Sequence, residues 1–198
     1  MSVTELSLAP GLLLAMPQLL DPSFSRAVVL MIEHNDDGSF GLIVNRPSDM
    51  AVSQLLDVLD ISWQGDPDAV VWAGGPVMPT SGWVLHEPTA ITGDATTDLH
   101  EGLESSRTIL VAPGLALSTA PAALRELASS PPARTRFLLG YAGWGAGQLA
   151  SEVSRGAWLH ADADPAIVFA ADADDMWESA IRSLGVDPEN VVPSHGIH

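Results

Sequence analysis

Glycines in two clusters are the residues of this sequence whose spacing most suggests a ligand site. The run G-Y-A-G-W-G-A-G-Q places Gly143, Trp144, Gly145, Gly147 and Gln148 between an expected strand and an expected helix. Glycines there let backbone N–H groups approach an anion, and the dipole of the following helix adds to the attraction. The run lacks the Gly-Lys-Ser/Thr end of a P-loop and the third glycine of the dinucleotide fingerprint. It therefore indicates either a ligand-binding loop or a tight turn packed around Trp144.

The second cluster is Gly74-Gly75-Pro76, which also follows an expected strand. It is either a place where the backbone approaches a ligand or a constrained turn that needs a positive φ angle. Arg46 lies beside another expected strand. Its guanidinium could hold an anionic ligand through two hydrogen bonds, or it could tie its own loop to a carboxylate. We take all four residues as candidates for ligand binding, and the two glycine clusters could share one pocket.

His34 and His86 are the candidate metal ligands. Each ends an expected strand, beside Glu33 and Glu87 respectively. Two imidazoles and a carboxylate would suit an open metal site if the strand ends were neighbours. The sequence has no H-E-x-x-H or H-x-H spacing. The alternative is therefore a pair of histidines that are hydrogen-bonded to loop backbone.

No residue is assigned as catalytic. The chain has no Cys, which excludes thiolate nucleophiles, disulfides and thiolate zinc sites. The G-x-S-x-G nucleophile elbow of serine hydrolases does not occur. An enzyme, either a hydrolase or a nucleotide-handling protein, stays an alternative, with His34, His86 and Arg46 as its candidate residues.

Charge and composition restrict the partners. The 198 residues carry 25 acidic and 8 basic side chains, which gives a net charge of −17. Such a chain repels phosphate backbones and anionic membrane surfaces, which argues against direct nucleic-acid binding and against membrane association. The apolar N-terminal stretch is short, lacks a basic flank and is interrupted by Pro17, so it is neither a signal peptide nor a membrane span. We expect a cytoplasmic protein without a cofactor.

Hydrophobic patterning predicts a mixed α/β (α+β) fold. We expect one domain over residues 1–198, with a core at 6–190 and a flexible tail at 191–198 that contains His195 and His198. Several connections are too short for helical crossovers, which favours a mixed or antiparallel sheet flanked by helices. Helices should begin near residues 48, 118 and 174 and cover 148–154, and residues 143–147 should form a loop. Strands are expected at 26–34, 39–45, 70–73, 82–86, 107–112, 136–141, 157–160 and 167–169.

The order of several motifs is informative. They are G-L-L-L-A-M-P from residue 11, D-P-S-F from 21, V-V-L-M-I-E-H-N from 28, G-S-F-G-L-I-V-N-R-P from 38, G-G-P-V from 74, G-W-V-L-H from 82 and G-Y-A-G-W-G-A-G-Q-L from 140. In this order they resemble the bacterial YqgE/AlgH family, over nearly the whole chain. The resemblance implies a compact mixed α/β fold with a curled, barrel-like sheet. It implies no established catalytic activity and no known catalytic residues.

The sequence departs from the family pattern at three places. Ser81 stands where the family usually has Arg, Ala150 stands where it usually has an acidic residue, and Ala120 replaces the Asp of a frequent Ser-x-Asp helix start. If the Arg or the acid belonged to a shared site, this chain lacks part of it. The family name implies a link to the regulation of alginate production. However, no helix in this sequence carries the Arg, Asn or Gln pattern of a base-reading helix.

These observations favour an accessory or regulatory protein that binds a small molecule or a protein partner and has no chemistry of its own. The alternatives are the enzyme described above and a transcriptional regulator that acts through a protein partner.

Overall fold

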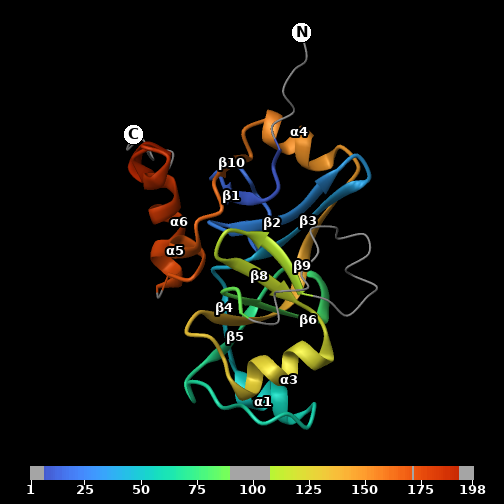
Figure 1. The fold of residues 1–198 in the computed structure, drawn as a ribbon. Helices are drawn as coiled ribbons and strands as arrows, with labels where there is room; N and C mark the ends of the chain where they lie inside the picture. Colours follow the sequence, from blue (N-terminus) through green and yellow to red (C-terminus); the bar gives the residue numbers. More distant parts are fainter. Residues whose placement is uncertain (1–6, 90–107, 171, 192–198) are drawn as a thin grey trace. The chain divides into compact units, whose positions relative to one another are not determined.

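The computed structural model describes residues 7–89, 108–170 and 172–191. The chain forms two compact units, and one long strand, β9 (Thr135–Gly145), contributes to both. Unit 1 comprises Met1–Asn45 and Ala142–His198, and unit 2 comprises Arg46–Tyr141. Figure 1 shows the elements of each unit. Within the described ranges, no helix has the length and apolar character that a membrane crossing requires.

Unit 1 contains an antiparallel sheet. Its strands are β1 (Gly11–Ala15), β2 (Val28–Asn35), β3 (Gly38–Ile43), β10 (Trp158–Ala161) and the last part of β9, in the order β10-β1-β2-β3-β9. β1 and the first part of β2 are buried at every residue, which explains why their sequences are apolar without alternation. The β2–β3 hairpin turns at Asn35, whose side-chain oxygen accepts hydrogen bonds from the N–H groups of Asp37 and Gly38.

Short helices complete unit 1. They are the 3-10 turn η1 (Pro22–Phe24), α4 (Gln148–Ser154), α5 (Pro165–Val168), α6 (Ala173–Ser183) and α7 (Pro188–Val191). The buried side chain of Trp177 attaches α6 to β1, because its indole N–H donates to the carbonyl oxygen of Ala15 at 2.9 Å. The guanidinium of Arg26 lies 5.1 Å from the centroid of the same indole ring.

In its described residues, unit 2 combines a mixed sheet with helices α1 and α3. Its elements are β4 (Pro47–Ala51), α1 (Val52–Asp57), β5 (Val70–Ala73), β6 (Val77–His86), β7 (Thr108–Ala112), β8 (Leu115–Ser118), α3 (Pro121–Ser129) and the first part of β9. β9, β6, β8 and β7 pair antiparallel in that order, whereas β5 runs parallel to β9. Residues of α1 and α3 pack with Val84 of β6 and Phe137 of β9 in one apolar core. The two helices lie next to each other in Figure 1.

The predicted strand at 167–169 is wrong. Ile167 and Val168 belong to helix α5, because local capping outweighs their preference for strands. The Asp164 carboxylate accepts the N–H of Ala166 at 2.8 Å, and Pro165 occupies the first turn, where its missing N–H costs nothing.

The other corrections concern the ends of elements. The helix expected near residue 48 begins only at Val52, after strand β4, and the Gln54 side chain accepts the N–H of Ala51 at 3.1 Å. The segment expected as a loop from 143 is strand as far as Gly145, and α6 begins after Asp172 rather than after Asp174 or Asp175. Strands β1, β4 and β8 were not predicted. Of the expected tail at 191–198, only Val191 lies within the described residues.

Candidate functional site

The first glycine cluster forms the end of β9 and the start of α4 in unit 1. Gly143 pairs with Phe40 and Gly145 pairs with Gly38 of β3. Gly147 precedes α4 with a φ of 70°, a conformation that glycine adopts without strain. The side-chain oxygen of Gln148 accepts the Gly145 N–H at 3.1 Å. The cluster is thus a short, exposed connection whose backbone is held by its own glutamine.

Trp144 is the buried residue of this cluster, and Glu152 of α4 organises its surroundings. One carboxylate oxygen of Glu152 accepts the indole N–H of Trp144 at 3.1 Å and that of Trp158 at 2.8 Å. The other oxygen accepts the side-chain N–H of Gln148 at 3.0 Å. The Trp144 and Trp158 rings meet edge to face at 5.8 Å. This network is consistent with the second interpretation of the motif, a tight turn packed around Trp144. The ligand-binding interpretation of residues 143–148 stays a prediction.

The second glycine cluster lies in unit 2, against β9. The Gly74 N–H donates to the carbonyl oxygen of Leu139 at 2.7 Å. Gly140 has a φ of 74°, and a Cβ atom there would lie 2.3 Å from the carbonyl oxygen of Gly75. The close approach therefore requires glycine at position 140. Arg46 is half-buried, and its carbonyl oxygen accepts the Ala73 N–H at 2.8 Å. Gly74, Gly75, Pro76 and Arg46 thus belong to a different unit from the first cluster.

The two candidate metal ligands also belong to different units. His34 of unit 1 is half-exposed, and its Nδ1 lies 2.7 Å from the hydroxyl of Ser39. His86 of unit 2 is fully buried, and both of its ring nitrogens have hydrogen-bond partners. In the part of the chain that the structure describes, no three His, Asp or Glu side chains are grouped in a way that could hold a metal ion.

An apolar cavity lies within unit 2. Residues of helices α1 and α3 and of strands β6, β8 and β9 line this cavity of about 350 Å³. This volume falls within the range of small-molecule pockets, roughly 300–1,000 Å³. Its apolar wall includes Leu55, Leu56, Leu124, Val84, Phe137 and Leu139, and its polar lining consists of Thr80, Ser118, Thr119 and Arg125.

Ser118 of the cavity wall hydrogen-bonds to two buried polar side chains, His86 and Thr108, that lie behind it. Strand pairing sets Ser118 of β8 opposite Val84 of β6 and opposite Thr108 of β7. Directly opposed residues point to the same face of a sheet, and so do residues two apart on one strand. His86, two residues after Val84, therefore points to the same face as Ser118 and Thr108. The Ser118 hydroxyl lies 2.9 Å from Nε2 of His86 and 2.6 Å from the Thr108 hydroxyl. Nδ1 of His86 lies 2.7 Å from the carbonyl oxygen of Glu87.

The direction of these hydrogen bonds follows from their chemistry. Burial lowers the pKa of His86 below 6.5, although the Glu87 carbonyl and the Glu87 carboxylate oppose this effect, so the imidazole is neutral at pH 7. A carbonyl oxygen only accepts, so the proton of the neutral ring is on Nδ1 and Nε2 is an acceptor. The Ser118 hydroxyl therefore donates to Nε2 of His86, and the Thr108 hydroxyl donates to Ser118. Ser118 and His86, 1% and 0% exposed respectively, are positioned as a hydroxyl and its base.

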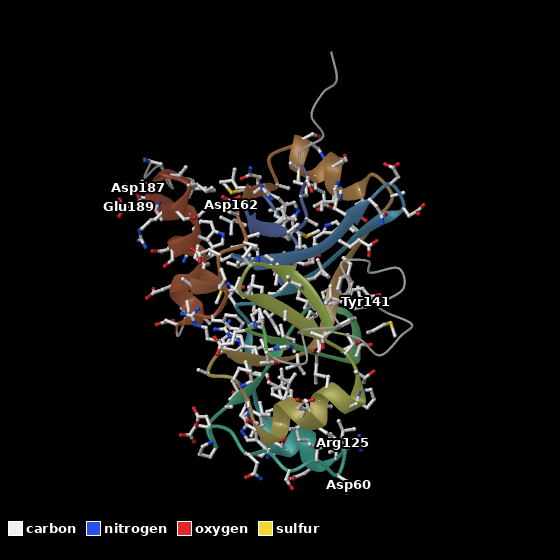
Figure 2. All side chains as sticks on the ribbon, viewed as in Figure 1. Asp60, Arg125, Tyr141, Asp162, Asp187 and Glu189 are labelled. Carbon is white, nitrogen blue, oxygen red and sulfur yellow. The ribbon has the colours of Figure 1, made fainter. Side chains whose placement is uncertain are left out.

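The charged groups of unit 2 differ in their surroundings. Arg125 lies on α3, is exposed and lines the cavity, so it is a cation available to a bound ligand (Figure 2). Arg136 is buried on β9, with its guanidinium 3.9 Å from the centroid of the Trp72 ring. Burial lowers the pKa of Arg136 to about 10, which leaves it charged at neutral pH. Arg136 thus stabilises the packing around Trp72 rather than lining the cavity.

Sequence reasoning missed this site for an identifiable reason. It singled out His86 as a candidate metal ligand and as a candidate residue of the alternative enzyme, but it assigned Ser118 to the start of a helix. Ser118 is instead the last residue of β8, and α3 begins three residues later with Pro121 at its first position. The alternation of β6 predicts that His86 and Val84 share a face. The missing signal was strand β8 and its register with β6.

A family model described as AlgH-like matches residues 12–189. A UPF0301 protein of Myxococcus xanthus is 41% identical over 193 residues, which cover 97% of this chain and 99% of the relative. A UPF0301 protein of Ruegeria pomeroyi is also 41% identical, over 92% of this chain and 94% of the relative. The chain belongs to the AlgH-like family.

Two solved structures share the fold. The solution structure of the AlgH protein from Pseudomonas aeruginosa has a TM-score of 0.70 and 32% identity, and the match covers all of both chains. A crystal structure of a Corynebacterium diphtheriae protein has a TM-score of 0.69 and 26% identity, over 92% of this chain and 90% of that one. These likenesses and the strand pairing confirm the predicted class, a mixed α/β fold with a curled, mainly antiparallel sheet and flanking helices. They also confirm the resemblance to the AlgH family.

Proposed function

We propose that the protein binds a small, mainly apolar molecule in the cavity of unit 2. The observation that carries this proposal is the cavity itself, which has an apolar wall and a few polar groups at defined positions. That combination is typical of ligand pockets, in which apolar contacts supply affinity and polar groups fix orientation. The sequence analysis favoured a cytoplasmic accessory or regulatory protein, and ligand binding at this site would suit that role.

The lining indicates what the ligand looks like. Leu55, Leu124 and Phe137 would contact an apolar body such as a hydrocarbon chain. Arg125 would face an anionic group at the exposed side of the cavity, in a protein whose net charge of −17 repels anions elsewhere. An amphipathic molecule with an acyl chain and an anionic end therefore fits the site best.

The proposal is tested with 1-anilinonaphthalene-8-sulfonate, an apolar fluorophore that carries one negative charge. We expect its fluorescence to rise on binding to the folded protein and to be displaced by decanoate. Leu124→Trp would fill the cavity and weaken binding by at least about tenfold, which corresponds to about 1.4 kcal/mol. Leu184→Trp is the matched control, because Leu184 lies in unit 1, is 38% exposed and does not line the cavity.

A second pair of variants tests the anionic end. Arg125→Ala should weaken the binding of both probes, whereas Arg134→Ala removes an exposed arginine outside the cavity and should not. The fold of each variant is checked by thermal unfolding. Unchanged affinity in Leu124→Trp, or an equal loss in Leu184→Trp, would remove the cavity as the binding site.

A further inference from the structure

The hydroxyl of Ser118 differs from the other hydroxyls that line the cavity. It donates a hydrogen bond of 2.9 Å to Nε2 of His86, and the opposite ring nitrogen is held by the Glu87 carbonyl at 2.7 Å. Sites of covalent catalysis are recognised by three groups: a nucleophile, an adjacent base, and a third group that holds the base in place. Here the third group is a backbone carbonyl rather than a carboxylate.

The arrangement is also unusual for a core. Three polar side chains from three strands are buried beside apolar residues, where polar groups are tolerated because they hydrogen-bond to one another. Strand pairing alone does not require polar side chains at Thr108, Ser118 and His86. The one position where these groups adjoin open space is Ser118, which lines the cavity.

We propose that Ser118 and His86 are the nucleophile and the general base of an acyl-transfer site, whose substrate is an ester with its acyl chain in the cavity. The inference rests on the proposed function, because the apolar wall must bind the acyl chain before Ser118 can react. Its substrate class is an ester of a small or medium-chain acid, with a polar leaving alcohol at the exposed side near Arg125.

The chemical step balances within the site. The Ser118 oxygen forms a bond to the acyl carbon while Nε2 of His86 takes the hydroxyl proton. The bond from the acyl carbon to the leaving oxygen breaks, and the leaving alcohol receives that proton from His86. A water molecule then attacks the acyl-serine, His86 removes its proton, and Ser118 leaves with that proton. The products are a carboxylic acid and an alcohol, and the enzyme is regenerated.

The test is covalent labelling of the whole protein with a fluorophosphonate that carries a hydrocarbon chain. Attack by Ser118 forms an oxygen–phosphorus bond, releases fluoride and adds a fixed mass to the chain. Cleavage after arginine gives a fragment of residues 108–125, in which fragment-ion spectra distinguish Ser118 from Thr108 and Thr119. We expect the adduct on Ser118, and the release of p-nitrophenolate from p-nitrophenyl hexanoate should be blocked in the labelled protein.

Three variants separate the chemistry from the fold. Ser118→Ala should abolish labelling, and His86→Gln should slow it by at least about tenfold, because general-base assistance contributes about 10²–10⁴-fold. Ser81→Ala is the control, since Ser81 lies on the same strand as His86 but does not line the cavity, and it should label like the parent. If Ser118→Ala fails to fold, the position of the adduct in the unaltered protein still shows whether Ser118 is the nucleophile.

Binding of 1-anilinonaphthalene-8-sulfonate is measured on the same samples, so that the two proposals can fail separately. No adduct in a protein that binds this probe would overturn the acyl-transfer site and leave the proposed function standing. No adduct and no binding would overturn both. An adduct confined to any residue other than Ser118 would also overturn the assignment.

Discussion

At the scale of single residues, the neutral state of His86 links the cavity to pH. Burial lowers the pKa of the folded imidazole, whereas the unfolded chain titrates near about 6.5. Below that pH the unfolded state binds a proton that the folded state does not, so the free energy of unfolding falls as the pH falls. The decrease begins near pH 6.5, continues down to the folded pKa and has a slope of at most about 1.4 kcal/mol per pH unit.

Urea unfolding between pH 5 and pH 8 measures this contribution. We expect the difference in unfolding free energy between the parent and His86→Gln to shrink as the pH falls below about 6.5, because the variant has no group to protonate at this position. His34→Gln is the control, since His34 is half-exposed and contacts only the Ser39 hydroxyl among the bonds described above. A constant difference across the range would show that His86 is not held neutral by the fold.

The same residues show how much of the site the sequence could predict. His86 was identifiable as a polar residue in the otherwise apolar segment 82–86. Its partner Ser118 is 32 positions away, and the two meet only because Leu85 pairs with Leu117. A shift of one residue in this register would turn Ser118 to the opposite face of the sheet. The register depends on contacts along the whole of β6 and β8, which no local pattern contains.

At the scale of elements, two glycines of the G-Y-A-G-W-G-A-G-Q run have different physical requirements. Gly140 and Gly147 have nearly equal φ angles, 74° and 70°, but different surroundings. A Cβ atom at 140 would lie 2.3 Å from a backbone oxygen, whereas one at 147 would meet nothing within 4 Å. A side chain at 140 is therefore excluded by the β5–β6 connection as well as by the φ angle, whereas a side chain at 147 is disfavoured by the φ angle alone.

Alanine substitutions should separate the two requirements. Gly147→Ala should lower the free energy of unfolding only through left-handed backbone strain, by about 1–2 kcal/mol. Gly140→Ala introduces the same strain and must also displace the Gly75 carbonyl. That displacement lowers the free energy of unfolding by about 1–3 kcal/mol more, by analogy with overpacked cores. Urea unfolding should therefore rank Gly140→Ala as clearly less stable than Gly147→Ala. Equal losses would mean that the turn at Gly75 shifts freely and is not held by β9.

The elements also differ in how far local sequence determines them. The two strands of the β2–β3 hairpin were predicted, at 26–34 and 39–45, because their apolar runs are separated by the turn residues Asn35–Gly38. Helix α5 was predicted as a strand because Ile167 and Val168 favour strands, although the preceding Asp164-Pro165 is a strong helix start. Strand β8 has only four residues and lies directly before α3, so its pattern is too short to separate from the helix that follows.

At the scale of the whole molecule, the dominant feature is the net charge of −17. Folding brings like charges together, and this repulsion opposes the compact state. Few basic groups compensate for it, and Arg26 and Arg182 both pair with the same carboxylate, that of Glu178. Screening should therefore stabilise the protein, because the Debye length shortens from about 30 Å at 0.01 M salt to about 10 Å at 0.1 M.

The midpoint of urea unfolding should rise between about 0.01 M and about 0.5 M sodium chloride at pH 7.5. A double variant, Glu126→Lys with Asp162→Lys, changes two exposed acidic residues and reduces the net charge from −17 to −13. Its midpoint at low salt should exceed that of the parent, and its gain from salt should be smaller, because less repulsion remains to be screened. Glu126→Gln with Asp162→Asn should fall between the two. An equal salt gain in all three proteins would instead indicate a general effect of salt on apolar burial, which does not depend on protein charge.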